Sequence, residues 1–217
     1  MNVCAFSRTY GERTVLDFPG FEFEYGKVYA VIGANGSGKS TFGKILAGIE
    51  KPDRKCSPAG NYSAGYMPQK SYAFKMSALK NIMLNGTDSA KANELIERLG
   101  LSELASSPAK KLSGGETAKL ALARIMMKDY KLLILDEPTA AMDMESTAAA
   151  EKLMREYTET TGCVMILITH SLQQAARTAD HTLFFSEGRL VEHGETAKLL
   201  ESPENETTKA FLDFFRG

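Results

Sequence analysis

The chain has 217 residues, of which 43% are hydrophobic, and its formal net charge is −1. Such a chain can bury a full core, and its charge argues against a nucleic-acid-binding protein that works by bulk electrostatics. No apolar run reaches the roughly 20 residues of a membrane helix, and the first residues lack a signal peptide. The cysteines Cys4, Cys56 and Cys163 show neither a pairing pattern nor metal-ligand spacing, so we expect inert thiols in a reducing, cytoplasmic setting.

The first part of the chain predicts β-structure. Residues 1–30 are rich in β-forming side chains and are punctuated by glycines, a pattern typical of short antiparallel strands. They lead into one buried strand at 27–32. A helix is expected from about 38 to 47, because Gly48 and the later Pro52 are helix-ending signals. The stretch AGYMPQ at 64–69 predicts a further strand.

The remaining chain alternates between helices and apolar strands. Residues 78–128 show helical spacing, whereas KLLILDEP (131–138) and CVMILITH (163–170) are solidly apolar. Such runs are typical of strands buried on both faces of a parallel sheet. Helices are expected at 145–157 and 172–179, followed by a hairpin that turns at Glu187-Gly188 and by two short helices. The fold class is therefore α/β, with a helical insertion.

A glycine-rich loop follows the first buried strand. Its residues match the P-loop pattern G-x-x-x-x-G-K-[ST] and are Gly33, Ala34, Asn35, Gly36, Ser37, Gly38, Lys39 and Ser40, with Thr41 next. The glycines let successive backbone N–H groups point inward and form an anion nest, and the following helix aims its positive end at the same place. Lys39 is expected to reach the β- and γ-phosphates of a nucleotide, and the Ser40 hydroxyl to ligate Mg²⁺.

The strand at 132–135 brings two acids to its carboxyl end, where ligands bind in open α/β sheets. Asp136 is expected to hold Mg²⁺, and Glu137 to polarise an attacking water molecule. General-base assistance of this kind contributes about 10²–10⁴-fold to a rate. Together, these two motifs favour a nucleoside triphosphatase that uses Mg²⁺.

Leu112-Ser113-Gly114-Gly115-Glu116 resembles the signature motif of the ATP-binding cassette (ABC) family. Other motifs of that family stand in the same order along nearly the whole chain. Tyr10 resembles the aromatic residue that stacks on adenine, and Gln69 resembles the glutamine of the Q-loop. Residues 140–143, which end in Asp143, resemble the D-loop. His170 resembles the switch histidine. Ser113 can cap its helix, and Gly114 and Gly115 leave room for a phosphate.

The resemblance implies a P-loop NTPase fold with a nucleotide-binding core at 1–71 and 130–217, an antiparallel β part near 1–30, and a helical signature subdomain at 72–129. It implies catalytic roles for Lys39, Gln69, Glu137 and His170, with Gln69 also a metal ligand. It further implies two chains that hold two ATP molecules between P-loop and partner signature, with Asp143 coupling the sites.

The resemblance also implies partners in a membrane. Separate transmembrane permease subunits would bind a groove beside Gln69, for which Tyr72, Phe74, Met76 and Met83 are candidates, and an extracytoplasmic solute-binding protein would complete the system. The cassette would then lie on the inner face of the cell membrane. Import of a polar amino acid or an oxyanion is favoured.

The alternative is a mechanical ABC ATPase that drives lipoprotein release or a cell-division complex. Glu116 supports this alternative, because it replaces the commoner glutamine, as in cassettes of that kind. No nucleic-acid partner is expected.

Overall fold

The computed structural model describes residues 1–53, 60 and 62–216. The strands are β1 (Asn2–Val3), β2 (Phe6–Tyr10), β3 (Arg13–Phe18), β4 (Phe21–Glu22), β5 (Val28–Ile32), β6 (Ala64–Met67), β7 (Leu132–Asp136), β8 (Val164–Ile168), β9 (His181–Ser186) and β10 (Arg189–Glu195). The helices are α1 (Lys39–Leu46), α2 (Ala78–Ile82), α3 (Ser89–Arg98), α4 (Gly114–Met126), α5 (Met144–Thr161), α6 (Leu172–Thr178), α7 (Thr196–Glu201) and α8 (Glu206–Arg216). Short 3₁₀ helices lie at Met83–Asn85, Ser102–Leu104 and Ala109–Lys111.

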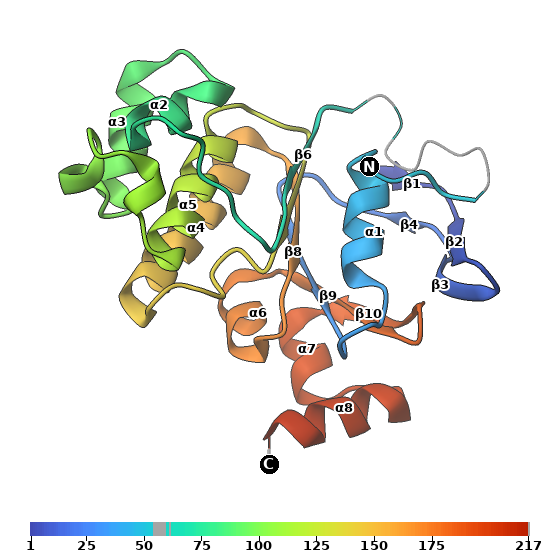
Figure 1. The fold of residues 1–217 in the computed structure, drawn as a ribbon. Coiled ribbons are helices and arrows are strands. Elements are labelled where there is room, and N and C mark those ends of the chain that lie inside the picture. The colour runs from blue at the N-terminus through green and yellow to red at the C-terminus, as the bar shows by residue number, and fades with distance from the viewer. Residues whose placement is uncertain (54–59, 61, 217) are drawn as a thin grey trace.

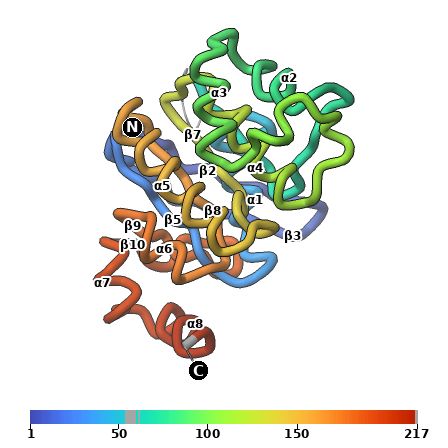
Figure 2. Tube along the Cα trace, turned by 90° about the vertical axis from the view of Figure 1, so that its left-hand side faces the viewer, coloured from blue at the N-terminus to red at the C-terminus, as the bar shows by residue number. Residues whose placement is uncertain are grey.

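One large, mostly parallel sheet organises the molecule, with helices against both faces (Figures 1 and 2). Its strand order is β2-β3-β10-β9-β5-β8-β7-β6, and the run from β9 to β6 is parallel throughout. The hairpins β2–β3 and β9–β10 are antiparallel, and a parallel contact between β3 and β10 joins them. The predicted N-terminal antiparallel strands are therefore confirmed, but β2 and β3 extend the main sheet, while β1 and β4 form a separate two-stranded sheet.

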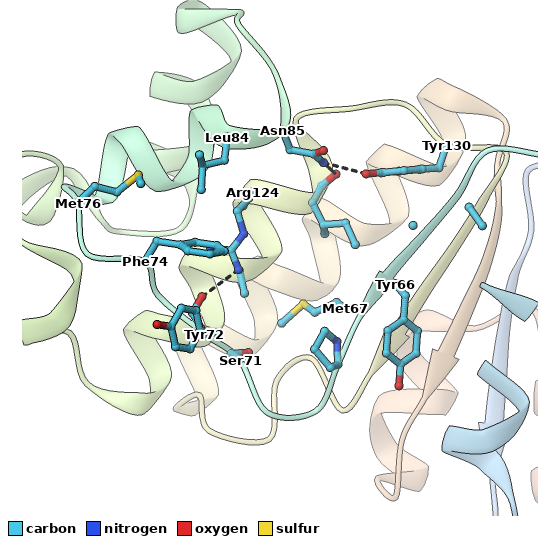
Figure 3. Close-up of a pocket in the computed structure, with 15 residues that line it drawn as sticks. Tyr66, Met67, Ser71, Tyr72, Phe74, Met76, Leu84, Asn85, Arg124 and Tyr130 are labelled. Carbon is cyan, nitrogen blue, oxygen red and sulfur yellow. Dashed lines mark hydrogen bonds between the residues drawn. The ribbon is translucent and has the colours of Figure 1, made fainter. Parts of the chain in front are cut away.

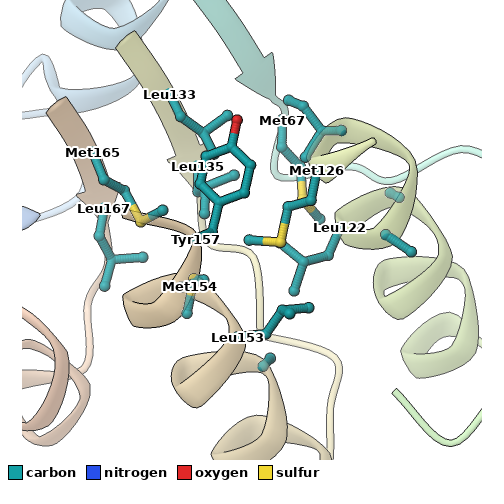
Figure 4. Packing of buried hydrophobic residues seen from close by; sticks show 14 of the residues in the cluster. Met67, Leu122, Met126, Leu133, Leu135, Leu153, Met154, Tyr157, Met165 and Leu167 are labelled. Atoms are coloured by element: carbon teal, nitrogen blue, oxygen red, sulfur yellow. The ribbon is translucent and has the colours of Figure 1, made fainter. Parts of the chain in front are cut away.

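The central strands are buried on both faces, as their apolar runs predict. Every residue of β5, β7 and β8 is buried, and successive side chains point to opposite sides of the sheet. In β7, Leu133 and Leu135 join the cluster formed with α4 and α5, which Figure 4 shows, whereas Leu132 and Ile134 join the cluster on the side of α1. This two-sided packing fixes the strand ends from which Asp136 and the P-loop emerge.

The helical insertion packs beside the sheet as α2, α3 and α4 (Figure 1). Each of these three α-helices begins at a side-chain cap that satisfies free backbone N–H groups: Ser77 caps α2, Asp88 caps α3 and Ser113 caps α4. The predicted helix at 145–157 is longer than expected. It begins after Asp143 and ends at Gly162, whose left-handed φ of 64° closes it.

The cysteines differ from one another in the structure. Cys163 is free and buried, and burial raises the pKa of its thiol, which makes it unreactive near neutral pH. Cys4 is not free in the structure, contrary to the prediction, and Cys56 lies outside the described residues. None of the helices in the described part of the chain is long and apolar enough to cross a membrane.

Candidate nucleotide-binding site

A cavity of about 390 Å³ lies where β5 and β7 end, beside the start of α1. It is within the size range of small-ligand sites. Its lining residues are Arg13, Val15, Asn35, Gly36, Gly38, Lys39, Ser40, Thr41, Gln69, Asp136, Glu137 and Ile168. The fold thus brings the glycine-rich loop, the two strand-end acids and Gln69 together, although they lie far apart in the sequence.

The loop between β5 and α1 takes a backbone path that requires glycine. Gly33, Gly36 and Gly38 have φ angles of 145°, 79° and 98°. A Cβ atom on Gly33 would lie 2.1 Å from the carbonyl oxygen of Phe185. Gly38 is the N-cap of α1 and offers no side-chain hydrogen bond to it. The first N–H groups of α1 are therefore left to bind an anion.

Lys39 spans this loop from the first turn of α1. Its ammonium donates to the carbonyl oxygens of Gly33 at 2.7 Å and of Ala34 at 2.9 Å. Burial lowers the pKa of Lys39, and the charges of Glu137 and Asp136 partly oppose this shift. A lysine ammonium has three donor hydrogens, and the third is directed at Ser37 Oγ over a long distance of 3.5 Å. Lys39 can therefore keep its two short bonds and exchange the third for a phosphate in the cavity.

The two acids at the end of β7 have different surroundings. Asp136 is 3% exposed, and its Oδ2 accepts a hydrogen bond of 2.9 Å from the Tyr66 hydroxyl. Glu137 adopts a φ of 51°, a costly conformation that is concentrated at functional sites, and its N–H donates to the Ile168 carbonyl oxygen. Its carboxylate lies 2.8 Å from Nδ1 of His170. The strained turn therefore directs Glu137 into the cavity and connects it to His170.

Three oxygen-bearing side chains in the cavity fit a magnesium ion. Ser40, Gln69 and Asp136 all line it and offer a hydroxyl, an amide and a carboxylate oxygen, the donor type that Mg²⁺ prefers. The described residues contain no cluster of three or more His, Cys, Asp or Glu side chains that could hold a metal. Mg²⁺ is usually bound through one or two protein groups together with substrate phosphates.

Tyr10 lies at the end of β2, outside the residues that line the cavity. Its side chain is 47% exposed, its hydroxyl donates to Glu50, and the Arg8 guanidinium lies over the ring, 4.7 Å from the centroid. One face of the ring is therefore covered, and a base can stack only on the other. Across the hairpin, Tyr10 pairs with Arg13, which does line the cavity.

The signature residues begin α4 and lie away from the cavity. Ser113 and Glu116 form a capping box: Ser113 Oγ accepts from the Glu116 N–H, and Glu116 Oε2 accepts from the Ser113 N–H. A Cβ atom on Gly115 would lie 2.7 Å from the carbonyl oxygen of Ala141, whereas one on Gly114 would meet nothing closer than 3.9 Å. The sequence assigned both glycines to a phosphate, but the structure shows that Gly115 also makes room for the loop that leads to Asp143.

Asp143 caps the next helix. Its carboxylate accepts from the Ser146 N–H at 2.7 Å, and this bond lowers the pKa of Asp143. None of the described residues that line the cavity is Ser113, Gly114, Gly115 or Asp143. Within one chain, the structure therefore brings the P-loop, Gln69 and the strand-end acids together and leaves the signature residues and Asp143 elsewhere.

Several residues of this region were not predicted from the sequence. Arg13 and Val15 line the cavity. They lie three and five positions after Tyr10, in a hairpin with a glycine turn, and this position could have indicated them as residues of the site. A neighbouring cavity of about 530 Å³ includes Ala34, Ser37 and the β9–β10 turn, whose Gly188 N–H donates to the Ser37 carbonyl oxygen. The bond from Tyr66 to Asp136 has no signal in the sequence, because it depends on how β6 and β7 are paired.

A glycine-rich loop between a buried strand and a helix, with carboxylates at the next strand end, defines a P-loop nucleotide-binding protein. Residues 16–140 match the sequence profile of the family described as ABC transporter. The chain therefore belongs to the ABC transporter family, as an ATP-binding subunit with ATPase activity.

Relatives agree with this assignment, and a solved structure agrees with the fold. The chain is 38% identical to the tungstate uptake system ATP-binding protein TupC of Peptoclostridium acidaminophilum, over 88% of this chain and 97% of the relative. It is 34% identical to the phosphate import ATP-binding protein PstB of Campylobacter jejuni, over 94% of each chain. The fold is similar to a solved ATP-binding subunit of an ABC transporter, with a TM-score of 0.83 and 23% identity over 98% of both chains.

Proposed function

We propose that this chain is the ATP-hydrolysing subunit of an importer for a small polar solute, of the oxyanion or polar amino-acid type. The relatives support this proposal, because their names describe uptake of tungstate, phosphate and arginine. The arginine transport ATP-binding protein ArtM of Bacillus subtilis is 31% identical over 95% of this chain and 96% of the relative.

In this proposal the cavity holds the triphosphate of Mg-ATP. The N–H groups at 33–41 and the Lys39 ammonium bind the phosphates, and Ser40, Gln69 and Asp136 hold Mg²⁺, which neutralises charge that develops on the phosphates. Glu137 orients and polarises the attacking water, and His170 fixes the Glu137 carboxylate through their 2.8 Å contact. Tyr10 stacks on the adenine, a contact worth about 1–3 kcal/mol.

The position of the signature residues carries the proposal that two chains act together. Ser113 and Gly114 stand exposed at the start of α4, outside the cavity that holds the other motifs. The Ser113 hydroxyl accepts from Glu116, so its own hydrogen stays available to a phosphate. A second copy turned head to tail would bring this helix end to the open side of the cavity. Such a contact is self-complementary, as twofold symmetry requires.

A groove beside β6 is the proposed binding site for the permease. Its volume is about 560 Å³, and Figure 3 shows Tyr72, Phe74 and Met76 along it, with Arg124 between them and Tyr130. These are three of the four residues that the sequence indicated. Met83 is not among the lining residues and packs against the hydrophobic core instead. A short amphipathic helix from a transmembrane subunit fits such an apolar groove.

In this proposal the chain lies in the cytoplasm, on the inner face of the cell membrane, with a solute-binding protein on the other side. The mechanical alternative rested on Glu116. Its carboxylate has a local function in the capping box, where the Ser113 N–H lowers the pKa of Glu116. Glu116 therefore needs no special partner to explain it, and import remains the proposal.

A complementation experiment tests the two-chain site. Lys39→Ala removes the phosphate-binding ammonium, and Gly114→Asp places a negative charge at the signature helix end. We expect each variant alone to hydrolyse ATP very slowly. Mixing them is expected to restore turnover, because one of the two sites in a mixed pair combines an intact P-loop with an intact signature. Released phosphate is the measurement.

The matched control mixes the Lys39→Ala chain with a chain that carries both Lys39→Ala and Gly114→Asp. No pairing of these two chains provides an intact site. Recovery in the first mixture and none in the control supports the proposal. A Gly114→Asp variant that alone hydrolyses ATP at the wild-type rate would mean that each chain acts by itself, and a first mixture as slow as its two components would contradict a site shared between paired chains.

A further inference from the structure

Tyr66 links the strand that leads to Gln69 with the acid at the end of β7. Its hydroxyl donates to Asp136 Oδ2 at 2.9 Å, although Tyr66 belongs to none of the motifs described above. β6 and β7 are paired in parallel with Tyr66 opposite Ile134, so the Tyr66 side chain runs along the sheet toward the residue two positions further on in β7. The bond therefore depends on the register of two strands that are distant in sequence.

The tyrosine ring is held between the sheet and α1. A Cβ atom on Gly43 would lie 3.3 Å from Cε2 of Tyr66 and 2.9 Å from Cδ1 of Ile168. The absence of a side chain at Gly43 thus makes room for the ring. Figure 3 shows Tyr66 at the edge of the groove, with its hydroxyl end turned away from Tyr130. Packing of this kind leaves the hydroxyl little freedom to turn to another partner.

The bond leaves the other carboxylate oxygen of Asp136 open. In the part of the chain that the structure describes, Oδ2 accepts from Tyr66 and Oδ1 has no hydrogen-bond donor. A hydrogen bond to one oxygen restricts the rotation of the carboxylate and so favours one direction for its second oxygen. Hydrogen bonds of this kind orient metal ligands, and their loss typically lowers metal affinity by about 10- to 100-fold.

We propose that Tyr66 is a positioning residue for magnesium, whose hydroxyl holds Asp136 in the orientation that binds the metal of Mg-ATP. This inference rests on the proposed function, because it requires the cavity to hold a nucleotide and its metal. Tyr66 itself does not contact the nucleotide. Tyr66 acts through Asp136 alone.

The test is Tyr66→Phe, which removes the hydroxyl and keeps the ring. Electron paramagnetic resonance measures the affinity of Mn²⁺, a substitute for Mg²⁺, for the complex of the protein with ADP. We expect the Mn²⁺ dissociation constant to rise about tenfold, while ADP affinity in the presence of EDTA changes less than about twofold. ADP serves as the nucleotide so that neither turnover nor pairing of chains affects the result.

Tyr157→Phe is the matched control. The Tyr157 hydroxyl is also part-buried and donates to a carbonyl oxygen, that of Lys128, at 2.8 Å, but Tyr157 is not among the residues that line the nucleotide cavity. Both variants lose one such hydroxyl, so both are expected to unfold at a somewhat lower temperature than the wild type. Only Tyr66→Phe should change the Mn²⁺ affinity, which separates positioning from general stabilisation.

A double variant tests whether Tyr66 acts through Asp136. In an Asp136→Asn background, the addition of Tyr66→Phe is expected to leave the Mn²⁺ affinity unchanged. An unchanged Mn²⁺ affinity in Tyr66→Phe alone, a parallel loss of ADP affinity in EDTA, or an additive loss in the double variant would each overturn the inference. A wild-type protein that binds neither ADP nor ATP would instead refute the proposed function.

Discussion

Replacement of Glu137 by glutamine is expected to lower the rate of ATP hydrolysis by about 10²–10⁴-fold, the usual contribution of a general base. Glutamine has nearly the same shape and can still bond to His170, but it cannot take up a proton from the attacking water. The Glu137 side chain is only 11% exposed, so bulk water is poorly placed to substitute for it. Phosphate release at saturating Mg-ATP measures the effect.

The control for this prediction is Glu159→Gln, a loss of the same charge at an exposed position near the end of α5. Its turnover should equal that of the wild type. ATP affinity in Glu137→Gln should be close to the wild-type value, because the P-loop and the metal ligands are intact. A variant that still hydrolyses ATP at more than about a tenth of the wild-type rate would show that another group acts as the base.

Replacement of Gly33 by alanine is expected to destabilise the protein by about 2–6 kcal/mol. Two costs combine: the φ of 145° strains a residue with a side chain by about 1–3 kcal/mol, and overpacking of a tight site adds about 1–3 kcal/mol. The second cost is expected because the new Cβ would lie 2.1 Å from the Phe185 carbonyl oxygen. Urea unfolding of the protein without nucleotide measures the change.

Gly36→Ala separates these two costs. Gly36 also has a positive φ, of 79°, but a Cβ there would meet nothing within 4 Å. We therefore expect a loss of only about 1–2 kcal/mol, the backbone cost of the left-handed region. Equal unfolding midpoints for the two variants would contradict the argument that the β9 carbonyl excludes a side chain from Gly33.

Much of the fold follows from patterns within short segments. The runs that became β5, β7 and β8 are apolar apart from Asp136, the last residue of β7, and two-sided burial favours such runs. The turn at Glu187-Gly188 and the end of α1 at Gly48 follow from local backbone preferences. Such features depend on neighbours in the sequence, so the sequence alone is sufficient to predict them.

Contacts between distant segments could not be predicted in this way. The parallel contact of β3 with β10 joins two hairpins that the sequence presents as separate. The bond from Tyr66 to Asp136 and the approach of Gly115 to Ala141 both depend on the register or packing of elements far apart in the chain. No single segment records such a register, because each strand would look the same if its partner were shifted.

The glycines of the signature show the same limit. Their spacing indicated an anion site at a helix end, and Gly114 remains open to one. Gly115 must also lack a side chain because the loop before Asp143 passes close to it. A pattern of residue types does not distinguish a glycine that leaves room for an anion from one that leaves room for another part of the chain. The exposed end of α4 is therefore the part of the proposed site for which a partner chain matters most.

The most direct test of the central claim is the molar mass of Glu137→Gln with and without saturating Mg-ATP, measured by light scattering on a sizing column. We expect a monomer without nucleotide and a dimer with Mg-ATP, and a return to monomer when Gly114→Asp is added to the same chain. A Glu137→Gln protein that binds Mg-ATP and remains a monomer would contradict a site shared between two chains.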